Sequence, residues 1–343
     1  MAASGQFYGV ADTFMMYTHN GGKSSARMGS GGASDSYWGI TAVEDLGEGL
    51  RVRFRLEGDM LTTNGNHLNP VAMYNREANI AVSSDTWGTL KLGKQFPAAL
   101  SLTADPFFFV QRLSPAAVAA QIVRDLGPGV AAIQVRVNDA ISYQTPSMNG
   151  LVISALYAPR QSRGLVVGNG DNDTSSKFVD GDAGVLATYA RGPWTFGGSY
   201  NALRPARPMG PGNVPLGLSR TDLIIASAAY TVGALQTSIA YGLIRSTAPA
   251  TFPVQIMSFG SLLQQGAHTF RASLLYRIIN GRSDNTVGGM VGYDYQLSKR
   301  VGVYARMGGF RNSSRAAFGV AASLPQEIGA STTLAAFGIT QRF

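Results

Sequence analysis

The sequence predicts an all-β protein, a single closed barrel of sixteen antiparallel strands that crosses a membrane. Three observations lead to this. Only 14% of the 343 residues are charged, against roughly 25% in ordinary soluble domains, and the mean hydropathy is close to zero at +0.04. Apolar and polar residues alternate with period two along many segments. Short turns and long loops alternate between these segments, which is typical of transmembrane barrels.

The period of two is clearest in residues 50–57. Their even positions hold Leu, Val, Phe and Leu, and their odd positions hold Arg, Arg, Arg and Glu. A strand places these two sets on opposite faces, whereas a helix would scatter the arginines around its axis. Residues 270–277, 301–307 and 337–343 show the same alternation, so we expect strands there as well.

The turns and loops set the number of strands. Tight turns are expected where turn-forming residues gather, near 46–49, 84–85, 146–149, 192–193, 233, 265–267 and 298–299. Long polar or Gly- and Pro-rich segments lie near 19–34, 61–72, 96–134, 161–181, 204–219, 247–254, 279–285 and 312–330. The intervening segments make sixteen strands of about ten residues each, in one domain over residues 1–343.

Two other architectures explain the sequence less well. The uncharged run 223–244 is long enough for a membrane helix, but it contains Ser, Thr and Gln and has Gly233 at its centre. Two strands that meet at Gly233 explain it better. A soluble sandwich or propeller of this length would carry far more Lys, Glu and Asp on its solvent face.

Segment 96–134 is too long for an ordinary connection, which suggests that it is functional. Ser114 is a suitable helix N-cap, Pro115 suits the first helical position, and Gly127 with Pro128 would end a helix. The residues between are rich in Ala. We therefore expect a short apolar helix in a loop that folds inward and packs on the barrel interior.

The charge of the chain is dominated by arginine. A net charge of +8 arises from 28 basic and 20 acidic residues, and 23 of the basic residues are Arg. If the polar strand faces line the lumen, these arginines form a positive ladder that favours anions. We expect about a third of the arginines to pair with carboxylates such as Glu57. The predicted constriction residues are the basic wall residues and the two acids of segment 96–134: Arg51, Arg53, Arg55, Arg76, Arg136, Asp105 and Asp125.

Several chemistries are not expected. The chain has no Cys, which excludes disulfides, thiolate metal sites and a cysteine nucleophile. The three histidines, His19, His67 and His268, share no strand and show no metal-ligand spacing, so we predict no enzyme, metal or cofactor. The acidic run 171–182 lacks the ordered ligand spacing and the terminal Glu of a calcium-binding loop, so we interpret it as a solvated external loop. The basic residues are spread singly along strands, which argues against nucleic-acid binding.

The first residues carry no basic segment followed by an apolar one, so no signal peptide is expected in this sequence. This fits either a cytosolic protein or a mature chain with a start Met in place of a removed signal.

Four short motifs and the last residue are familiar together: FYGVAD at 7–12, EDLGEGL at 44–50, WGTLKLGKQ at 87–95, GYDYQLSKR at 292–300, and the terminal Phe343. In this order and spacing, the chain resembles the trimeric general porins of Gram-negative outer membranes, above all their β-proteobacterial and neisserial branch. The resemblance covers essentially the whole chain. It implies short periplasmic turns, long external loops, a homotrimer, and contact with outer-membrane lipid and lipopolysaccharide.

The same resemblance implies a constriction in which arginines of neighbouring strands face acids of the third loop. Arg76 and Arg136 match two of those arginines, whereas Tyr37 stands where the family has a third. The acidic stretch of many third loops is replaced here by residues 105–109. If Arg76 faces the lumen, strand alternation turns Glu77 outward, which would place this strand at a subunit interface.

The sequence thus predicts a water-filled channel for passive diffusion of small hydrophilic solutes, with a preference for anions. Two alternatives stay open. The same barrel could be a channel selective for one class of anion, or a surface adhesin with a plugged lumen that conducts nothing.

Overall fold

The structure is a computed structural model that describes residues 4–67, 72–97, 105–107, 113–116, 136–160, 177–204, 219–249, 251–282, 284–316, 318–319 and 327–343. Its strands are β1 (Ser4–Asn20), β2 (Lys23–Ser30), β3 (Tyr37–Gly47), β4 (Leu50–Asp59), β5 (Glu77–Ser84), β6 (Gly88–Gln95), β7 (Val137–Gln144), β8 (Leu151–Arg160), β9 (Lys177–Arg191), β10 (Trp194–Leu203), β11 (Thr221–Val232), β12 (Leu235–Ser246), β13 (Val254–Gln265), β14 (His268–Ile279), β15 (Asp284–Gln296), β16 (Val301–Asn312) and β17 (Thr332–Arg342).

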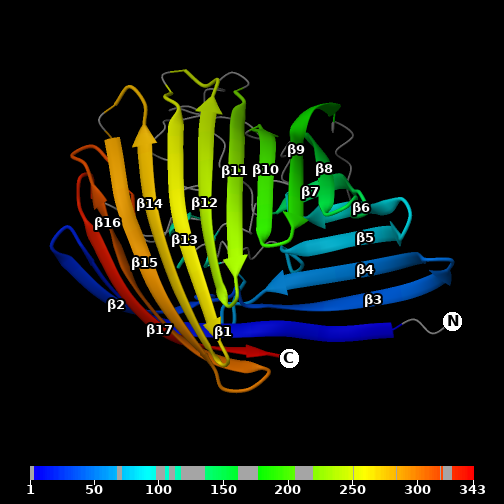
Figure 1. Ribbon diagram of the computed structural model, residues 1–343, viewed down its shortest axis with the longest axis horizontal. Helices are drawn as coiled ribbons and strands as arrows, with labels where there is room; N and C mark the ends of the chain where they lie inside the picture. Colours follow the sequence, from blue (N-terminus) through cyan, green and yellow to red (C-terminus); the bar gives the residue numbers. More distant parts are fainter. Residues whose placement is uncertain are drawn as a thin grey trace.

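The strands close into one antiparallel barrel (Figure 1). From β3 to β17 each strand pairs with the next, and β17 pairs with β1. Strand β1 pairs with β2 along residues 13–20 and with β3 along residues 4–10. β2 and β3 are therefore two pieces of one barrel strand, and the sixteen-stranded antiparallel barrel predicted from the sequence is confirmed.

The uncharged run 223–244 is a hairpin, as predicted. β11 and β12 pair along their whole length and meet at a turn that contains Gly233. Gly233 has φ +55°, a left-handed conformation that costs glycine little and other residues more. In the described part of the chain, no helix has the length and apolar character that a membrane crossing would require.

The two faces of the strands differ in polarity. On β4, Phe54 points outward and is 41% exposed, whereas Glu57 points inward and is 5% exposed. The outward face carries large apolar side chains around the barrel, among them Phe7, Met15, Ile80, Leu274, Met307 and Phe337. An apolar outer wall suits contact with lipid hydrocarbon, and closure of the barrel pairs the first strand with the last.

The barrel interior has two unlike sides. On the strands drawn from yellow-green to red in Figure 1, β11–β17, inward apolar side chains such as Leu275, Met290 and Phe310 form a buried cluster. Phe107 and Leu113 of segment 96–134 pack into this cluster. On the blue and cyan strands, β4 to β6, the inward side chains include most of the charged residues discussed below.

The described parts of segment 96–134 contact inward-facing side chains of the wall. The Arg271 guanidinium on β14 donates a hydrogen bond to the Pro106 carbonyl oxygen at 2.5 Å. The Arg306 guanidinium on β16 lies 5.4 Å from the centre of the Phe107 ring. The helix expected over residues 114–128 lies outside the described residues beyond 116 and stays a prediction.

The expected orientation of Glu77 is wrong. β5 begins at Glu77, so Arg76 precedes the strand and strand alternation does not set the direction of its side chain. Glu77 and Asn79 are buried on the inner face, 3% and 4% exposed, and Ile80 points outward with 45% exposed. The reason for placing this strand at a subunit interface therefore disappears.

Candidate functional site

A group of charged side chains covers the inner wall around β4–β6 and the residues just before β5 and β7. We call it the charged wall. It contains five cations, Arg53, Arg55, Arg76, Lys91 and Arg136, and four carboxylates, Asp35, Glu57, Asp59 and Glu77. Several of these cations pair with the carboxylates, and the cations outnumber the carboxylates by one, so the charged wall carries a small positive excess over a network of ion pairs.

Arg76 is held from three sides. Its Nη1 atom lies 2.9 Å from Asp35 Oδ2, and its Nε atom lies 3.4 Å from Glu57 Oε2. Its guanidinium also covers the ring of Tyr37 at 4.4 Å from the ring centre. Tyr37 thus supplies a cation–π contact at the position where the resemblance implied a further arginine.

Glu57 connects several members of the charged wall. The Tyr8 hydroxyl donates to Glu57 Oε1 at 2.7 Å, and Arg55 Nη1 lies 3.9 Å from the same oxygen. Arg55 Nη1 is also 3.8 Å from Glu77 Oε2. Because Glu57 and Glu77 are buried, these partners keep the two carboxylates from being isolated charges.

Arg136 precedes β7 and stacks on an aromatic ring. Its guanidinium carbon lies 3.3 Å from the centre of the Phe96 ring. Burial, and next the nearby positive charge of Arg76, lower the pKa of Arg136 to about 10. At neutral pH it is still a cation, so two arginines stand near one another on this wall.

The structure thus brings Arg53, Arg55, Arg76 and Arg136 together and separates Arg51 from them. Arg51 lies at the end of β4 near the short turns, its side chain is 47% exposed, and its Nη2 atom is 3.2 Å from Asp85 Oδ2 in the β5–β6 turn. Sequence alternation assigned Arg51 the correct face but could not give its distance from the loop that narrows the barrel.

Asp105 accepts two hydrogen bonds from within segment 96–134. The Ser114 hydroxyl donates to Asp105 Oδ2 at 2.5 Å, and the Phe107 backbone N–H donates to Asp105 Oδ1 at 3.0 Å. Asp105 is 5% exposed. Its carboxylate therefore stabilises the conformation of this part of the loop. The other predicted acid, Asp125, lies outside the described residues.

A second charged group, which the sequence did not reveal, lies on the inner wall of β14–β16. Asp294 binds two arginines: its Oδ2 is 2.5 Å from Arg271 Nε and its Oδ1 is 2.6 Å from Arg306 Nη2. In the strand register both arginines are opposite Gly292, one from each neighbouring strand. A Cβ at position 292 would come within 2.9 Å of both Arg306 Nη1 and the Phe107 ring, so the glycine makes room for this arrangement.

Asp12 is a further residue whose role was not predicted. It is fully buried on β1, and its carboxylate accepts hydrogen bonds from five donors: the backbone N–H groups of Gly32, Ala33 and Ser34, and the hydroxyls of Tyr304 and Thr340. These bonds hold the segment between β2 and β3 on the inner wall. Asp35 in that segment can then reach Arg76. The only signal in the sequence was that Asp12 ends the FYGVAD motif.

Comparison with known proteins gives the family. A profile described as Gram-negative porin matches residues 1–315. The chain belongs to the Gram-negative porin family. Outer membrane porin protein 32 of Delftia acidovorans is 26% identical over 337 residues, 92% of this chain and 86% of that protein. An outer membrane porin protein of Bordetella pertussis is 32% identical over 152 residues, which span 43% of this chain and 35% of that protein.

Solved structures share the fold of this porin. An anion-selective porin from Comamonas acidovorans superimposes with a TM-score of 0.82 at 21% identity, over the whole of both chains. The OmpT protein of Vibrio cholerae in its trimer form gives a TM-score of 0.69 at 13% identity, also over both chains. The porin is a channel-forming barrel of the Gram-negative outer membrane, as the sequence motifs suggested.

Proposed function

We propose that this porin prefers anions among the small hydrophilic solutes that pass through it. The observation that carries the proposal is the charged wall, where five cations stand against four carboxylates. A fixed positive excess on a narrow aqueous passage lowers the energy of an entering anion and raises that of a cation. The Comamonas porin of the same fold is named anion-selective, which supports the proposal.

The carboxylates of the charged wall hold the arginines in place and also limit the positive excess. Arg76 is fixed by Asp35 and Glu57, so its charge needs no reorganisation when a solute arrives. The same two carboxylates attract cations when Arg76 is absent. We therefore expect a graded preference for anions over cations, set by the balance of this wall.

The reversal potential of single channels in a planar bilayer tests the proposal. In a tenfold gradient of KCl, the potential should have the sign of a channel more permeable to chloride than to potassium. A potential of the opposite sign in the wild-type porin would overturn it. The double variant Arg76→Glu with Arg136→Glu should shift the potential toward the potassium value.

We further propose that the porin is a homotrimer. The fold is the same as that of OmpT, which is described in a trimer form. Mass measurement of the purified porin in detergent, corrected for bound detergent, should give three times the 36.2 kDa of one chain. A mass of one or two chains would contradict the proposal.

We also propose that the porin carries out no catalysis. Its three histidines have separate partners: His19 pairs with the Ser24 hydroxyl and His268 with the Tyr293 hydroxyl. His67 pairs with the Asp59 backbone oxygen and lies 3.4 Å from the Asp59 carboxylate, away from the two hydroxyls bonded to the other histidines. A nucleophile activated by a base that is in turn held by an acid would need all three groups in one place. Ester hydrolysis by the purified porin at the rate of buffer alone is the expected result, and a faster rate that follows the folded protein would refute it.

A further inference from the structure

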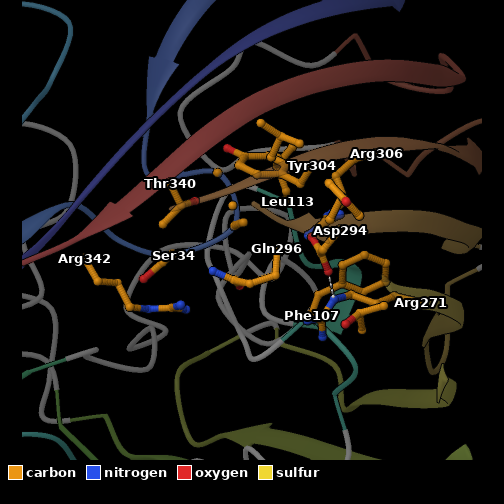
Figure 2. A pocket seen from close by; sticks show the side chains of 16 residues that line it. Ser34, Phe107, Leu113, Arg271, Asp294, Gln296, Tyr304, Arg306, Thr340 and Arg342 are labelled. Atoms are coloured by element: carbon orange, nitrogen blue, oxygen red, sulfur yellow. Dashed lines mark hydrogen bonds and ion pairs between the residues drawn. The ribbon is translucent and has the colours of Figure 1, made fainter. Parts of the chain in front are cut away.

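A pocket of about 130 Å³ lies in the inner wall beside β14–β17, next to the segment between β2 and β3 that carries Asp35 of the charged wall (Figure 2). We call it the β14–β17 pocket. Phe107 and Leu113 of segment 96–134 line it on the apolar side. Its polar lining includes Ser34, Arg271, Asp294, Gln296, Arg306 and Arg342. A buried water needs only about 10–15 Å³ of such space, so the pocket has room for an anion of several atoms.

The lining of the pocket is positively charged. It contains three arginines and one aspartate, Asp294. Both carboxylate oxygens of Asp294 are occupied by Arg271 and Arg306, at 2.5 and 2.6 Å. The carboxylate is thus already neutralised by its own neighbours, and the pocket keeps a positive excess that would attract an anionic solute.

Arg271 and Arg306 are fixed in place by these and other bonds. Arg271 also donates to the Pro106 carbonyl oxygen, and Arg306 Nη1 donates to the backbone oxygens of Tyr293 and Ala305 at 3.2 and 2.9 Å. These bonds anchor each guanidinium at two of its nitrogen atoms, whereas the buried Nε of Arg306 makes no hydrogen bond among the described residues. The two arginines thus contribute positive charge at a fixed position, rather than a guanidinium free to make a bidentate contact with an anion.

Arg342 is different. Within the part of the chain that the structure describes, its guanidinium makes no hydrogen bond or ion pair, and only its backbone N–H is bonded, to the Arg300 carbonyl oxygen at 2.8 Å. Figure 2 shows its side chain extending from β17 into the pocket toward Gln296. A planar guanidinium with five donors matches the two oxygens of a carboxylate or phosphate.

We propose that the β14–β17 pocket binds a small oxyanion, a carboxylate or phosphate, which the Arg342 guanidinium ligates in the field of Arg271 and Arg306. This inference rests on the proposed anion preference and adds to it a defined anion-binding site on the lumen wall. An anion held there lies beside Phe107 of segment 96–134. The flux of such anions then saturates with concentration, unlike simple diffusion.

The test compares Arg342→Gln with Arg300→Gln. Arg300 is exposed in the β15–β16 turn, lies at the same end of the barrel, and does not line the pocket. Inorganic phosphate, and in a separate series succinate, is added on the short-turn side while single-channel chloride current is recorded. The wild-type current should fall to a plateau. Arg342→Gln should raise the half-blocking concentration about tenfold, since a charge-assisted bidentate contact is lost, and Arg300→Gln should leave it unchanged.

Equal half-blocking concentrations in the two variants would overturn the inference, as would a wild-type current that shows no saturable block by either anion. If only phosphate or only succinate is affected by Arg342→Gln, that anion is the ligand class. Failure of the underlying anion preference would show separately, as a wild-type reversal potential of the cation-preferring sign in KCl alone.

Arg342 ends β17, which closes the barrel between β16 and β1, so a folding defect in Arg342→Gln must be separated from loss of the anion contact. The wild-type porin offers a second measurement. Phosphate should slow the reaction of Arg342 with phenylglyoxal, read by mass spectrometry of peptides, while the reaction of Arg300 proceeds at the same rate. Equal rates at Arg342 with and without phosphate would overturn the inference without any variant.

Discussion

Replacing Arg76 with glutamine should shift the ion preference of the porin toward cations. The substitution removes one of the five cations of the charged wall and keeps a polar side chain of similar length. Asp35 and Glu57, at 2.9 and 3.4 Å from the guanidinium, lose their shared partner. The net charge of the wall then falls from plus one to zero.

The size of the shift follows from Coulomb's law. At about 5 Å, one unit charge changes the energy of a monovalent ion by about 0.8 kcal/mol in water, and 0.1 M salt reduces this to about 0.5 kcal/mol. The change has opposite signs for chloride and potassium. The difference between the two ions is therefore about 1 kcal/mol, which corresponds to about a fivefold change in permeability ratio.

The assay is the reversal potential in a tenfold KCl gradient, measured at 0.1 M mean salt and again at 1 M. Arg51→Gln is the matched control, because it removes an arginine from the same inner face of β4, at the turn beside Asp85. About four residues of strand, or roughly 13 Å, separate positions 51 and 55, so screening should leave the control close to wild type. The effect of Arg76→Gln should shrink at 1 M salt, where the screening length is about 3 Å.

An unchanged reversal potential in a folded Arg76→Gln porin would refute the reasoning, since it would remove Arg76 from the electrostatic path of the ions. Equal shifts in Arg76→Gln and Arg51→Gln would also refute it, because net charge alone would then decide the preference. Retention of the compact, heat-modifiable band on unheated gels serves as the check on folding.

The remaining predictions concern other parts of the barrel. Glu57→Gln keeps an acceptor for the Tyr8 hydroxyl but removes a negative charge, so the reversal potential should move toward chloride by a similar factor of about five; movement toward potassium would contradict the assigned balance. Asp12→Ala leaves five donors, three of them in buried hydrogen bonds, without their acceptor and should cost about 3 kcal/mol or more. The loss should appear as a lower melting temperature of the barrel in detergent, with Asp85→Ala as an exposed control. Gly233→Ala should destabilise the barrel by about 1 kcal/mol, because φ is +55° at this position. No neighbouring atom lies within 4 Å of the added methyl group. A larger loss of stability in the same melting experiment would therefore point to a cause other than the backbone conformation.

Local pattern was enough to predict the architecture because strand alternation and turn residues act over a few positions. The strand face of the arginines at positions 51, 53 and 55 and the turn at Gly233 are examples that were predicted correctly, although Arg51 lies away from the other two arginines' ion pairs. Alternation failed at Arg76 and Glu77 because the strand begins between them. The alternation rule applies only within a strand, so it cannot tell at which residue the strand begins.

The sequence by itself determined that this chain is a porin barrel with an apolar outside and an arginine-rich inside. Composition, period two and motif order suffice for that, since each depends on neighbours in the chain. Only the tertiary structure decided which charges meet. Arg76 and Asp35 are 41 residues apart, and Tyr304 and Asp12 are 292 apart, and closure of the barrel brings them into contact. The same closure leaves the Arg342 guanidinium without a hydrogen bond or ion pair among the described residues, at the edge of a positively charged pocket.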